Sequence, residues 1–519
     1  MKYTFLFLLL TTLIRPAMQA QNLQKLGHLP YAPLSLAGCW HHVDQNGGEW
    51  ALVGTSAGMS IVDVSDPSQP IERFQVPGLT NNWRELRTWA GYAYVVSEAT
   101  PSGVTIVNLN LLPDTIEWKV WRGNGIFQDS VVNNHTVQAV DGYLYLFDCN
   151  KVAQGAVIVS LEDPWNPKIQ SEISDFYVHD GFIRGDTLWT SEGGQSQIGV
   201  YDVSDKANPQ LITRFPHQPG YSHNSELSTN SKVLFTTVET VNQPLASFDV
   251  SNLDDIKQLD LYKPSKKPAG EVHNVRVFPG DFLVCPSYRG QLTVVDASHP
   301  ENMIEIAWDS LGNSLVWDAD PYLPSGIILT TAKNEGLFIY QMNYQHAAWL
   351  EGAVTDLFSA APLADAKVFV LNTPNADTTM VDGRYQTGAA QSGSYVVRVE
   401  RNGYETQVHS NIALNSGTVT LRNFALKPLV IAVDEPDEDQ AVQVSPMPFS
   451  RYLKITVPAH YQAANWQLCD SKGAVLREMQ GMPSENVEFQ SLQSLPDGIY
   501  ILRNNKGYSQ QLIKSSAQH

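Results

Sequence analysis

The chain of 519 residues contains 34 Lys and Arg against 53 Asp and Glu, which gives a formal net charge of −19. Binding to the phosphates of nucleic acid needs a basic stretch, and the sequence has none, so nucleic acid is excluded as a partner. The length predicts several domains, and the 10% of aromatic residues together with 35 glycines favour turn-rich β domains.

Residues 1–20 have the pattern of a secretory signal peptide. Lys2 precedes an apolar stretch over residues 5–13, and a polar region ends at Ala20. The apolar stretch is too short to cross a membrane, and no later apolar run reaches the roughly 18 residues that a membrane-spanning helix needs. We therefore predict cleavage after residue 20, export of the mature chain and no transmembrane segment.

One pattern occurs seven times between residues 21 and 345. In residues 271–303, a polar His-Asn pair precedes an alternating segment, and a turn at Pro279-Gly280 separates it from two further apolar runs. Alternation broken by Gly and Pro turns is typical of an antiparallel β meander. The last run ends at a position that serves as a register mark: Asp63, Asn108, Ser160, Asp202, Asp249, Asp296 and Gln341.

The register marks are spaced by about 46 residues, the length of a four-stranded propeller blade. A single blade has exposed edges and too little core to fold alone, so we predict a closed seven-bladed β-propeller over residues 21–345. The seventh copy lacks an outer strand. Residues 22–30 resemble the outer-strand segments 71–78 and 211–220, so this N-terminal strand is predicted to complete blade seven. The Asp side chains at the register mark are predicted to cap the following turn.

Two further β modules follow the repeats. Residues 346–428 contain short alternating strands at regular spacing, which predicts a small β-sandwich. The acidic residues 429–442 are predicted to form a solvated linker. Residues 443–519 again alternate and form the third β module. The predicted fold class is all-β throughout.

The repeats resemble the LVIVD-repeat propellers of secreted bacterial proteins, including the choice-of-anchor B group. SIVDVSDPSQP at 60–70 and GVYDVSDKANP, which begins at Gly199, match that repeat closely, whereas copies two, three and seven depart from its Asp-Val-Ser pattern. The resemblance implies the propeller fold over residues 22–345. It implies no particular activity.

The two later modules also resemble known families. Residues 346–428 are similar to the carboxypeptidase regulatory-like β-sandwich, on the Gly352 to Asp356, Asp382-Gly383 and Gly393-Ser-Tyr segments. That module is an accessory domain without catalytic residues. Residues 443–519 resemble the β-sandwich-like C-terminal sorting domain of type IX secretion substrates in the Bacteroidetes, on Pro446-Met-Pro-Phe and the segment 495–500. This resemblance implies contact with the type IX machinery and a protein released or attached at the outer surface of the outer membrane.

Candidate ligand-binding residues lie at a matched register, where the first strand of each repeat begins. Because the first strand of a blade lines the central channel, these side chains are expected to surround one mouth of it. The residues are His42, Arg84, His135, His179, His223, His273 and, in the last copy, Trp317 or Asp318. Imidazoles with Glu85, Asp180, Glu226 and Glu271 nearby could hold a metal ion or an anionic ligand.

A different role for these histidines stays open. A histidine that recurs at the start of a strand can instead form hydrogen bonds between neighbouring blades and serve only the fold. The sequence contains no His-Glu-x-x-His, Cys-x-x-Cys, Gly-x-Ser-x-Gly or phosphate-loop motif. We therefore predict a monomeric, non-enzymatic propeller without a cofactor that binds an extracellular protein or glycan through one face. The alternative is an extracellular hydrolase or lyase with a His/Arg/Glu site at the channel mouth.

Overall fold

The computed structural model describes residues 22–150, 154–267, 270–429, 441–480 and 486–516. The predicted signal peptide and residues 430–440 of the predicted linker lie outside this part. The described residues form β-strands and two short 3-10 helices, η1 (Gly125–Phe127) and η4 (Ala459–Tyr461), so the all-β prediction is confirmed. The chain divides into two compact units, Met1–Pro428 and Leu429–His519. No helix in the described part is long and apolar enough to cross a membrane.

Seven four-stranded antiparallel sheets occupy the described residues between Leu23 and Met342. We number them in chain order by their innermost strand. Sheets 1 to 3 contain β2 (Leu36–Val43), β3 (Glu49–Thr55), β4 (Gly58–Asp63) and β5 (Ile71–Pro77); β6 (Arg84–Trp89), β7 (Tyr92–Ser97), β8 (Val104–Asn108) and β9 (Glu117–Trp121); and β10 (Thr136–Val140), β11 (Tyr143–Cys149), β12 (Gly155–Ser160) and β13 (Lys168–Ile173).

Sheets 4 to 7 repeat this order of strands. They contain β14 (Asp180–Arg184), β15 (Thr187–Ser191), β16 (Gln197–Asp202) and β17 (Gln210–Pro216); β18 (Ser222–Leu227), β19 (Val233–Val238), β20 (Leu245–Asp249) and β21 (Lys257–Tyr262); β22 (Arg276–Phe278), β23 (Phe282–Ser287), β24 (Gln291–Asp296) and β25 (Ile304–Ser310); and β26 (Val316–Asp320), β27 (Ile327–Ala332), β28 (Gly336–Met342) and β1 (Leu23–Leu29).

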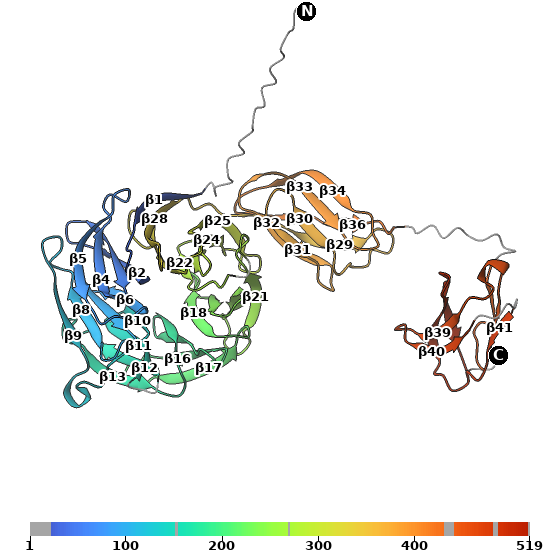
Figure 1. Cartoon of the computed structure of the whole chain (residues 1–519), viewed down its shortest axis with the longest axis horizontal. Coiled ribbons are helices and arrows are strands. Elements are labelled where there is room, and N and C mark those ends of the chain that lie inside the picture. Colours follow the sequence, from blue (N-terminus) through green and yellow to red (C-terminus); the bar gives the residue numbers. More distant parts are fainter. Residues whose placement is uncertain (1–21, 151–153, 268–269, 430–440, 481–485, 517–519) are drawn as a thin grey trace, which may run out of the picture. The chain divides into compact units, whose positions relative to one another are not determined.

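The seven sheets stand around a common centre (Figure 1). The innermost strands contact one another in the cyclic order β2, β6, β10, β14, β18, β22; β23 of the sixth sheet then contacts β26, and β26 contacts β2. Sheet 7 is composite, because β1 pairs antiparallel with β28, from Leu23 opposite Met342 to Leu29 opposite Leu337. Pairing with β1 covers the outer edge of β28, which would otherwise expose unpaired backbone groups.

Hydrophobic side chains fill the spaces between neighbouring sheets. Between sheets 1 and 2, for example, Trp50 and Leu52 pack with Leu86 and Val95. Middle strands such as β3 are almost completely buried, whereas outer strands such as β5 are mostly exposed to solvent. The core of each sheet thus depends on its neighbours, as expected for repeats that cannot fold singly.

The predicted role of the Asp residues at the register mark is confirmed. Each carboxylate accepts a hydrogen bond from the backbone N–H two residues further on, at Ser65, Ser204, Ser251 and Ser298, over 2.8 to 3.1 Å. These contacts close the tight turn after the third strand of a sheet. The Asp residues are therefore part of the scaffold.

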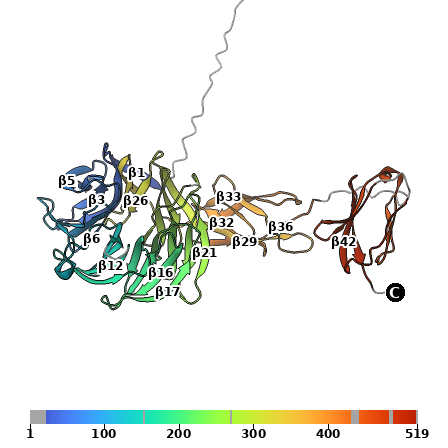
Figure 2. The same cartoon turned by 60° about the horizontal axis from the view of Figure 1, so that its bottom comes forward.

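A β-sandwich follows the seventh sheet and packs on sheet 6 (Figure 1, Figure 2). Its two sheets enclose a core that includes Leu350, Val368 and Phe424. The strands are β29 (Ala348–Asp356), β32 (Arg384–Ala389), β35 (Val419–Leu421) and β36 (Phe424–Leu426) in one sheet, and β31 (Ala376–Thr378), β30 (Lys367–Val370), β33 (Gly393–Glu400) and β34 (Gln407–Leu414) in the other. Trp349 Nε1 donates a hydrogen bond to Asn302 O at 2.9 Å, which ties the sandwich to sheet 6.

The second unit also consists of two sheets with a common core. Phe449, Trp466 and Leu502 are buried in it. The strands are β37 (Gln443–Ser445), β38 (Leu453–Thr456) and β41 (Asn486–Phe489) in the smaller sheet, and β40 (Val475–Met479), β39 (Trp466–Asp470), β42 (Gly498–Asn504) and β43 (Ser509–Lys514) in the larger. Phe449 of the Pro-Met-Pro-Phe segment is fully buried, so this motif anchors the fold of the unit.

Candidate functional site

Five aromatic side chains from five consecutive sheets form a continuous row around the centre of the ring. We call them the aromatic row: His135, His179, His223, His273 and Trp317. Successive ring centroids lie 4.3, 4.6, 4.2 and 4.7 Å apart. Each side chain stands at or just before the start of an innermost strand, because the repeats share one register. The structure thus brings together four of the five histidines that the sequence placed at this register.

Local backbone irregularities direct two members of the row inward. The register of β18 against β19 shifts between Ser222 and Asn224, and that of β26 against β27 shifts between Val316 and Asp318. His223 and Trp317 are the extra residues of these two bulges. A bulge re-aims the side chain of its extra residue. The shift explains why Trp317, and not Asp318, belongs to the row.

Glu85 closes the row on the side of sheets 1 and 2. Its Oε1 accepts a hydrogen bond from Trp317 Nε1 at 2.8 Å. In sheet 1 the chain has Gly38 below this carboxylate, and a Cβ there would lie only 2.3 Å from Glu85 Oε2. Burial, and then the charge of Asp318, raises the pKa of Glu85 to about 7. A glycine in one sheet therefore makes room for a carboxyl group from the next.

Three of the predicted residues lie outside the row. Arg84 directs its guanidinium to the carbonyls of Thr55 and Leu79 and holds the loop before β6, so its neighbour Glu85 takes the inner position. A shift of one residue along a strand moves a side chain to the opposite face. His42 lies near the far end of β2, opposite Trp50, whereas the row lies at the strand starts. These two placements correct the sequence prediction.

Asp318 points into a polar layer beneath the aromatic row. Its Oδ1 accepts hydrogen bonds from Arg276 at 2.8 Å and from Asn274 at 3.0 Å, and all three residues are buried. The layer encloses a cavity with room for about one water molecule, lined also by Glu85, Arg87 and Asp180. Asp318 is therefore a buried ion-pair partner and does not stand at a mouth of the channel.

Burial keeps most imidazoles of the row neutral. It holds the pKa of His179 and of His273 well below the usual range, with the neighbouring histidines acting in the same direction, and it lowers the pKa of His223. His135 differs because its Nδ1 lies 2.5 Å from Glu98 Oε1: burial lowers its pKa, but the hydrogen bond and charge of Glu98 raise it overall. Neutral imidazoles retain a lone pair that can bind a metal ion.

One histidine meets the expectation of a purely structural role. His273 Nδ1 lies 2.5 Å from Trp317 O on the next sheet. His223 and His179 differ, because His223 Nδ1 and His179 Nε2 are buried and have no hydrogen-bond partner among the described residues. Buried polar atoms without partners are costly and call for a ligand or an ordered water.

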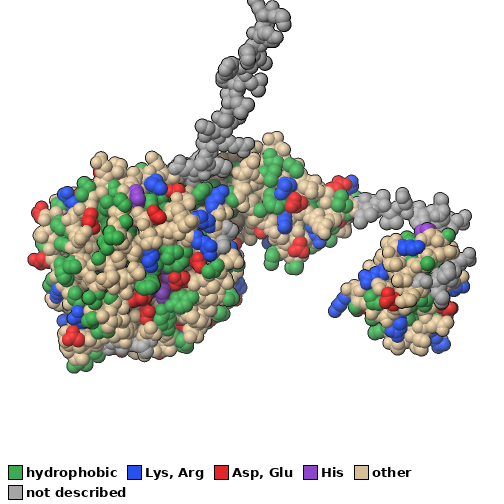
Figure 3. All heavy atoms as spheres, viewed as in Figure 1, with side chains coloured by type: hydrophobic (Ala, Val, Ile, Leu, Met, Phe, Trp, Pro, Cys, Tyr) green, Lys and Arg blue, Asp and Glu red, His purple; other side chains and the backbone are tan. Residues whose placement is uncertain are grey.

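A second row, which the sequence prediction missed, surrounds the aromatic row. It consists of Asp148, near the end of β11, and of four residues that directly follow the second strand of a sheet: Glu98, Glu239, Tyr288 and Lys333. Tyr288 OH donates to Glu239 Oε1 at 2.9 Å, and the Lys333 ammonium lies 4.4 Å from the Trp317 ring centroid. The signal was present in the sequence as an acidic residue recurring after the second apolar run. Figure 3 shows charged side chains and histidine around the centre of the ring.

Two tyrosines fix the orientation of His179. The hydroxyls of Tyr177 and Tyr221 lie 2.6 Å apart, and each lies 3.1 Å from His179 Nδ1. Tyr177 OH also donates to Asp148 Oδ2 at 3.3 Å. A consistent set of donors results when Nδ1 carries the proton and donates to a tyrosine oxygen, which leaves the lone pair on Nε2. Such outer partners fix the tautomer of metal-binding histidines.

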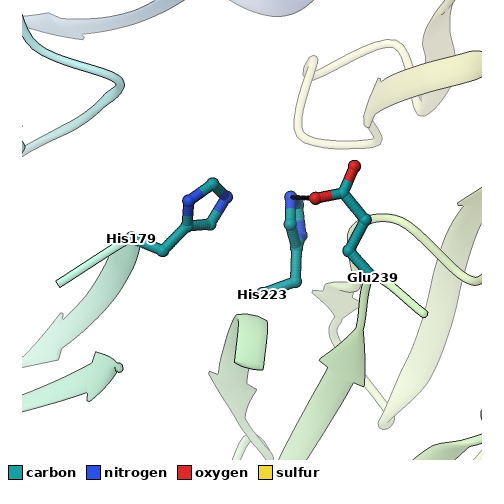
Figure 4. Close-up of side chains that lie close together, drawn as sticks. All are labelled: His179, His223 and Glu239. Atoms are coloured by element: carbon teal, nitrogen blue, oxygen red, sulfur yellow. Dashed lines mark ion pairs between the residues drawn. The ribbon is translucent and has the colours of Figure 1, made fainter. Parts of the chain in front are cut away.

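Two groups of three side chains have donor atoms close enough to hold a metal ion. In each group the atoms lie within 4.8 Å of one another. The first comprises His179, His223 and Glu239, and in Figure 4 a ring nitrogen of His179 faces the gap beside His223 and Glu239. The second comprises Glu98, His135 and Asp148, where burial raises the pKa of Asp148 to about 6.

A larger cavity lies further along the innermost strands, beyond the polar layer. We call it the far cavity; its volume is about 250 Å³. Its wall combines aromatic and hydrogen-bonding side chains: Trp40, His41, Arg87, Gln138, Phe182, Ser225, Glu226, Arg276 and Tyr322. The Arg87 guanidinium lies 4.1 Å from the Trp40 ring centroid, and Tyr322 OH donates to Glu226 Oε1 at 3.0 Å. The sequence prediction named Glu226 as a nearby charge but did not identify this cavity.

His41 is the titratable group of the far cavity with a charged partner. Its Nδ1 lies 2.7 Å from the buried Asp320 Oδ2. Burial lowers the pKa of His41, but the charge of Asp320 and this hydrogen bond raise it overall. The neighbouring His42, which the sequence prediction had selected, is absent from the lining of the cavity.

Two regions of the chain match known protein families. Residues 47–77 match the LVIVD repeat. They span β3, β4 and β5 of sheet 1 and include the Asp63 turn. Residues 350–427 match the carboxypeptidase regulatory-like domain and cover the sandwich on sheet 6. A search of curated proteins found no match to the chain.

The matched families agree with the two corresponding resemblances seen in the sequence. An LVIVD repeat within an array of four-stranded sheets, together with a carboxypeptidase regulatory-like domain, indicates a protein of the extracellular β-propeller type. The matches name no ligand and no reaction. The function must therefore be argued from the site itself.

Proposed function

We propose that this chain is a secreted, non-enzymatic seven-bladed β-propeller that binds a neutral glycan in the far cavity. The closed cyclic order of contacts between innermost strands and the pairing of β1 with β28 support the seven-bladed closure. In a ring of this kind one end of the channel is a ready site for a ligand, because seven strands converge there.

The far cavity carries the proposal. Small-ligand sites are concave, largely apolar and equipped with a few placed polar groups. Trp40, Phe182 and Tyr322 offer aromatic surface, while Gln138, Ser225 and Arg87 offer hydrogen-bonding groups. A volume of about 250 Å³ fits a single sugar unit at the end of a glycan.

The charged side chains around the far cavity have ion-pair or hydrogen-bond partners. Arg276 forms an ion pair with Asp318 at 2.8 Å, and His41 pairs with Asp320 at 2.7 Å. Burial raises the pKa of Glu226, which accepts hydrogen bonds from Tyr322 OH and from the backbone N–H of Val277. Arg87 donates to the neutral acceptors Gln138 Oε1 and Leu86 O. Since each charged group already has an ion-pair or hydrogen-bond partner, a neutral polar ligand suits the cavity better than an anion or a cation.

A glycan array probed with the full-length chain tests the proposal. Trp40→Ala and Phe182→Ala should each weaken the binding of the glycan detected by about tenfold or more, because each removes an aromatic face. Trp118→Ala is the matched control, since Trp118 lies on the outer strand β9 and is 42% exposed. Absence of glycan binding, or equal binding by the wild type and Trp40→Ala, would contradict the proposal.

The alternative function, a hydrolase or lyase at the aromatic row, has one observation in its favour. The second metal-capable group contains Asp148, whose raised pKa of about 6 suits a general base. Against it, the cavity beneath the row has room for about one water molecule, so no substrate fits inside. Hydrolysis of a broad ester and glycoside panel by wild type but not by Asp148→Asn would support the alternative.

Export and sorting belong to the same proposal. We place the chain with the choice-of-anchor B group and assign residues 443–519 to type IX sorting, on the Pro446-Met-Pro-Phe and 495–500 segments. The mature protein then begins near residue 21 and is released or held at the outer surface of the outer membrane. Mass spectrometry of the protein recovered from the medium or cell surface tests this. Loss of residues 1–20 and of the region from 443 onward is expected, and an intact intracellular chain would contradict it.

A further inference from the structure

The aromatic row contains an arrangement that glycan binding in the far cavity does not explain. His179 lies just before β14, His223 lies in β18, and Glu239 directly follows β19, so the three residues belong to two neighbouring sheets. Their donor atoms lie within 4.8 Å of one another, although His179 belongs to a different repeat from His223 and Glu239. His179 and His223 are almost fully buried, while the Glu239 side chain is 34% exposed.

We propose that His179 Nε2, His223 and Glu239 form a binding site for one divalent transition-metal ion of the Zn²⁺ type. Two imidazole nitrogens and one carboxylate oxygen are the donor set of three-ligand zinc sites, and imidazole favours Zn²⁺ over Mg²⁺ or Ca²⁺. The inference goes beyond the proposed glycan binding and does not depend on it, because the two sites lie at different levels of the channel.

A buried nitrogen atom without a partner points to a missing ligand. His179 Nε2 is buried without a hydrogen-bond partner in the described part of the chain, and His223 Nε2 lies 3.9 Å from Glu239 Oε2. A distance of 3.9 Å is too long for a hydrogen bond, and an ion bound by both atoms would draw them to roughly 3.3 Å, the separation of two ligands in a tetrahedral zinc site. In Figure 4 a ring nitrogen of His223 faces the Glu239 carboxylate, and a ring nitrogen of His179 faces His223 from the other side.

The surrounding groups hold two of the three ligands, His179 and Glu239, as outer partners do in metal sites. Tyr177 and Tyr221 contact His179 Nδ1 at 3.1 Å, an arrangement that is consistent with a proton on Nδ1 and the lone pair on Nε2. Tyr288 OH donates to Glu239 Oε1 at 2.9 Å, which leaves Oε2 toward His223. Both ligand types thus have an oriented second partner, which raises metal affinity.

The neighbouring group of Glu98, His135 and Asp148 is a weaker candidate. His135 Nδ1 already lies 2.5 Å from Glu98 Oε1, and Asp148 accepts from Tyr177. Metal binding there would have to break a charge-assisted hydrogen bond, which is among the stronger kinds. One equivalent of metal per chain is therefore expected.

The test uses the full-length chain freed of metal by a chelator and titrated with Zn²⁺ in competition with a chromophoric chelator. Wild type should bind one Zn²⁺, and saturation should raise its unfolding temperature, because the ion binds the folded state. His179→Gln, His223→Gln and Glu239→Gln should each weaken binding by about 100-fold or more, and Tyr221→Phe by about tenfold. His346→Gln is the matched control, since His346 Nδ1 lies 3.1 Å from Asp296 Oδ2 in another part of the chain.

Folding is checked on the metal-free variants by circular dichroism. Glu239→Gln is the most informative variant. Glu239 is partly exposed, and the amide oxygen that replaces its carboxylate oxygen can still accept the hydrogen bond from Tyr288 OH. The proposal is overturned if folded wild type binds no Zn²⁺, if Glu239→Gln binds as tightly as wild type, or if binding is lost only in His135→Gln. An unaltered affinity in Tyr221→Phe would overturn the role given to the tyrosine pair.

Discussion

Trp317 Nε1 donates a hydrogen bond to Glu85 Oε1 at 2.8 Å, although 232 residues separate the two in the sequence. Trp317 belongs to sheet 7 and Glu85 to sheet 2, and sheet 1 between them has Gly38 at this level. The contact completes the circle that His135, His179, His223 and His273 begin. The centre of the ring is thus closed by side chains as well as by backbone.

Glu85→Gln should alter the pH dependence of stability. Burial raises the pKa of Glu85 from 4.5 to about 7 in the folded chain, so the folded state holds this proton more tightly than the unfolded state. The wild type therefore loses stability as the pH rises from about 4.5 to about 7. Gln cannot ionise and still accepts from Trp317, so the variant should exceed wild type at pH 8 by roughly 3 kcal/mol and equal it near pH 4.5.

Chemical unfolding followed by near-ultraviolet circular dichroism checks this, with the difference between the two proteins taken at each pH. Other carboxyl groups with a raised pKa, such as Asp148 and Asp260, titrate in both proteins, so their contributions cancel in the difference. A difference that does not change with pH would show that Glu85 is ionised in the folded protein throughout.

Gly27→Ala should weaken closure of the ring. Gly27 lies in β1, and a Cβ there would meet Pro67 O at 2.0 Å, which is backbone and cannot rotate away. We expect a loss of about 1–3 kcal/mol, as for overpacked sites. Gly194→Ala is the control, because nothing lies within 4 Å of its Cβ position. Equal unfolding temperatures for the two variants would mean that β1 does not depend on this contact.

Asn302→Ala should loosen the sandwich from sheet 6. Asn302 is buried, and its Nδ2 donates to Glu351 Oε1 and to Thr387 O, both at 3.0 Å. Losing these hydrogen bonds should cost about 1–3 kcal/mol, since it leaves Thr387 O without this donor. Calorimetry should then separate one transition into two, whereas Gln386→Ala, an exposed neighbour of Glu351, should leave the trace unchanged. A single unshifted transition in Asn302→Ala would contradict this account of the junction.

The repeat pattern could be predicted because its causes are local. Alternation, Gly and Pro turns and the Asp63-type turns each depend on a few adjacent residues, and the four histidines follow from the repeat spacing. The resemblance of residues 346–428 to the regulatory-like domain likewise depends on a continuous stretch, which the family match supports.

The inner register could not be predicted, because it depends on pairing between strands. The bulges at His223 and Trp317 are visible only when β18 meets β19 and β26 meets β27. The bulge at Trp317 decides between Trp317 and Asp318, which the sequence left open. Arg84 was predicted in place of its neighbour Glu85, although β6 pairs with β7 without a register shift. The sequence prediction named His42 for sheet 1, but no large side chain of this sheet lies at the level of the aromatic row. Gly38 lies there, and its lack of a side chain leaves room for Glu85.

Glu239 and the two tyrosines escaped the sequence prediction for a different reason. Glu239 follows the second strand of sheet 5, so its contribution appears only when the starts of first strands and the ends of second strands are considered together. Tyr177 and Tyr221 precede His179 and His223 by two residues, a regularity that two copies alone do not make conspicuous.

Anomalous diffraction at the zinc edge, from crystals of the full-length chain grown with Zn²⁺, tests most directly whether the converging repeats build a metal site. A single strong peak is predicted within about 2.0–2.2 Å of His179 Nε2, a His223 ring nitrogen and a Glu239 carboxylate oxygen. Crystals with no peak at the aromatic row, or with a peak bound by Glu98, His135 and Asp148 instead, would contradict the account.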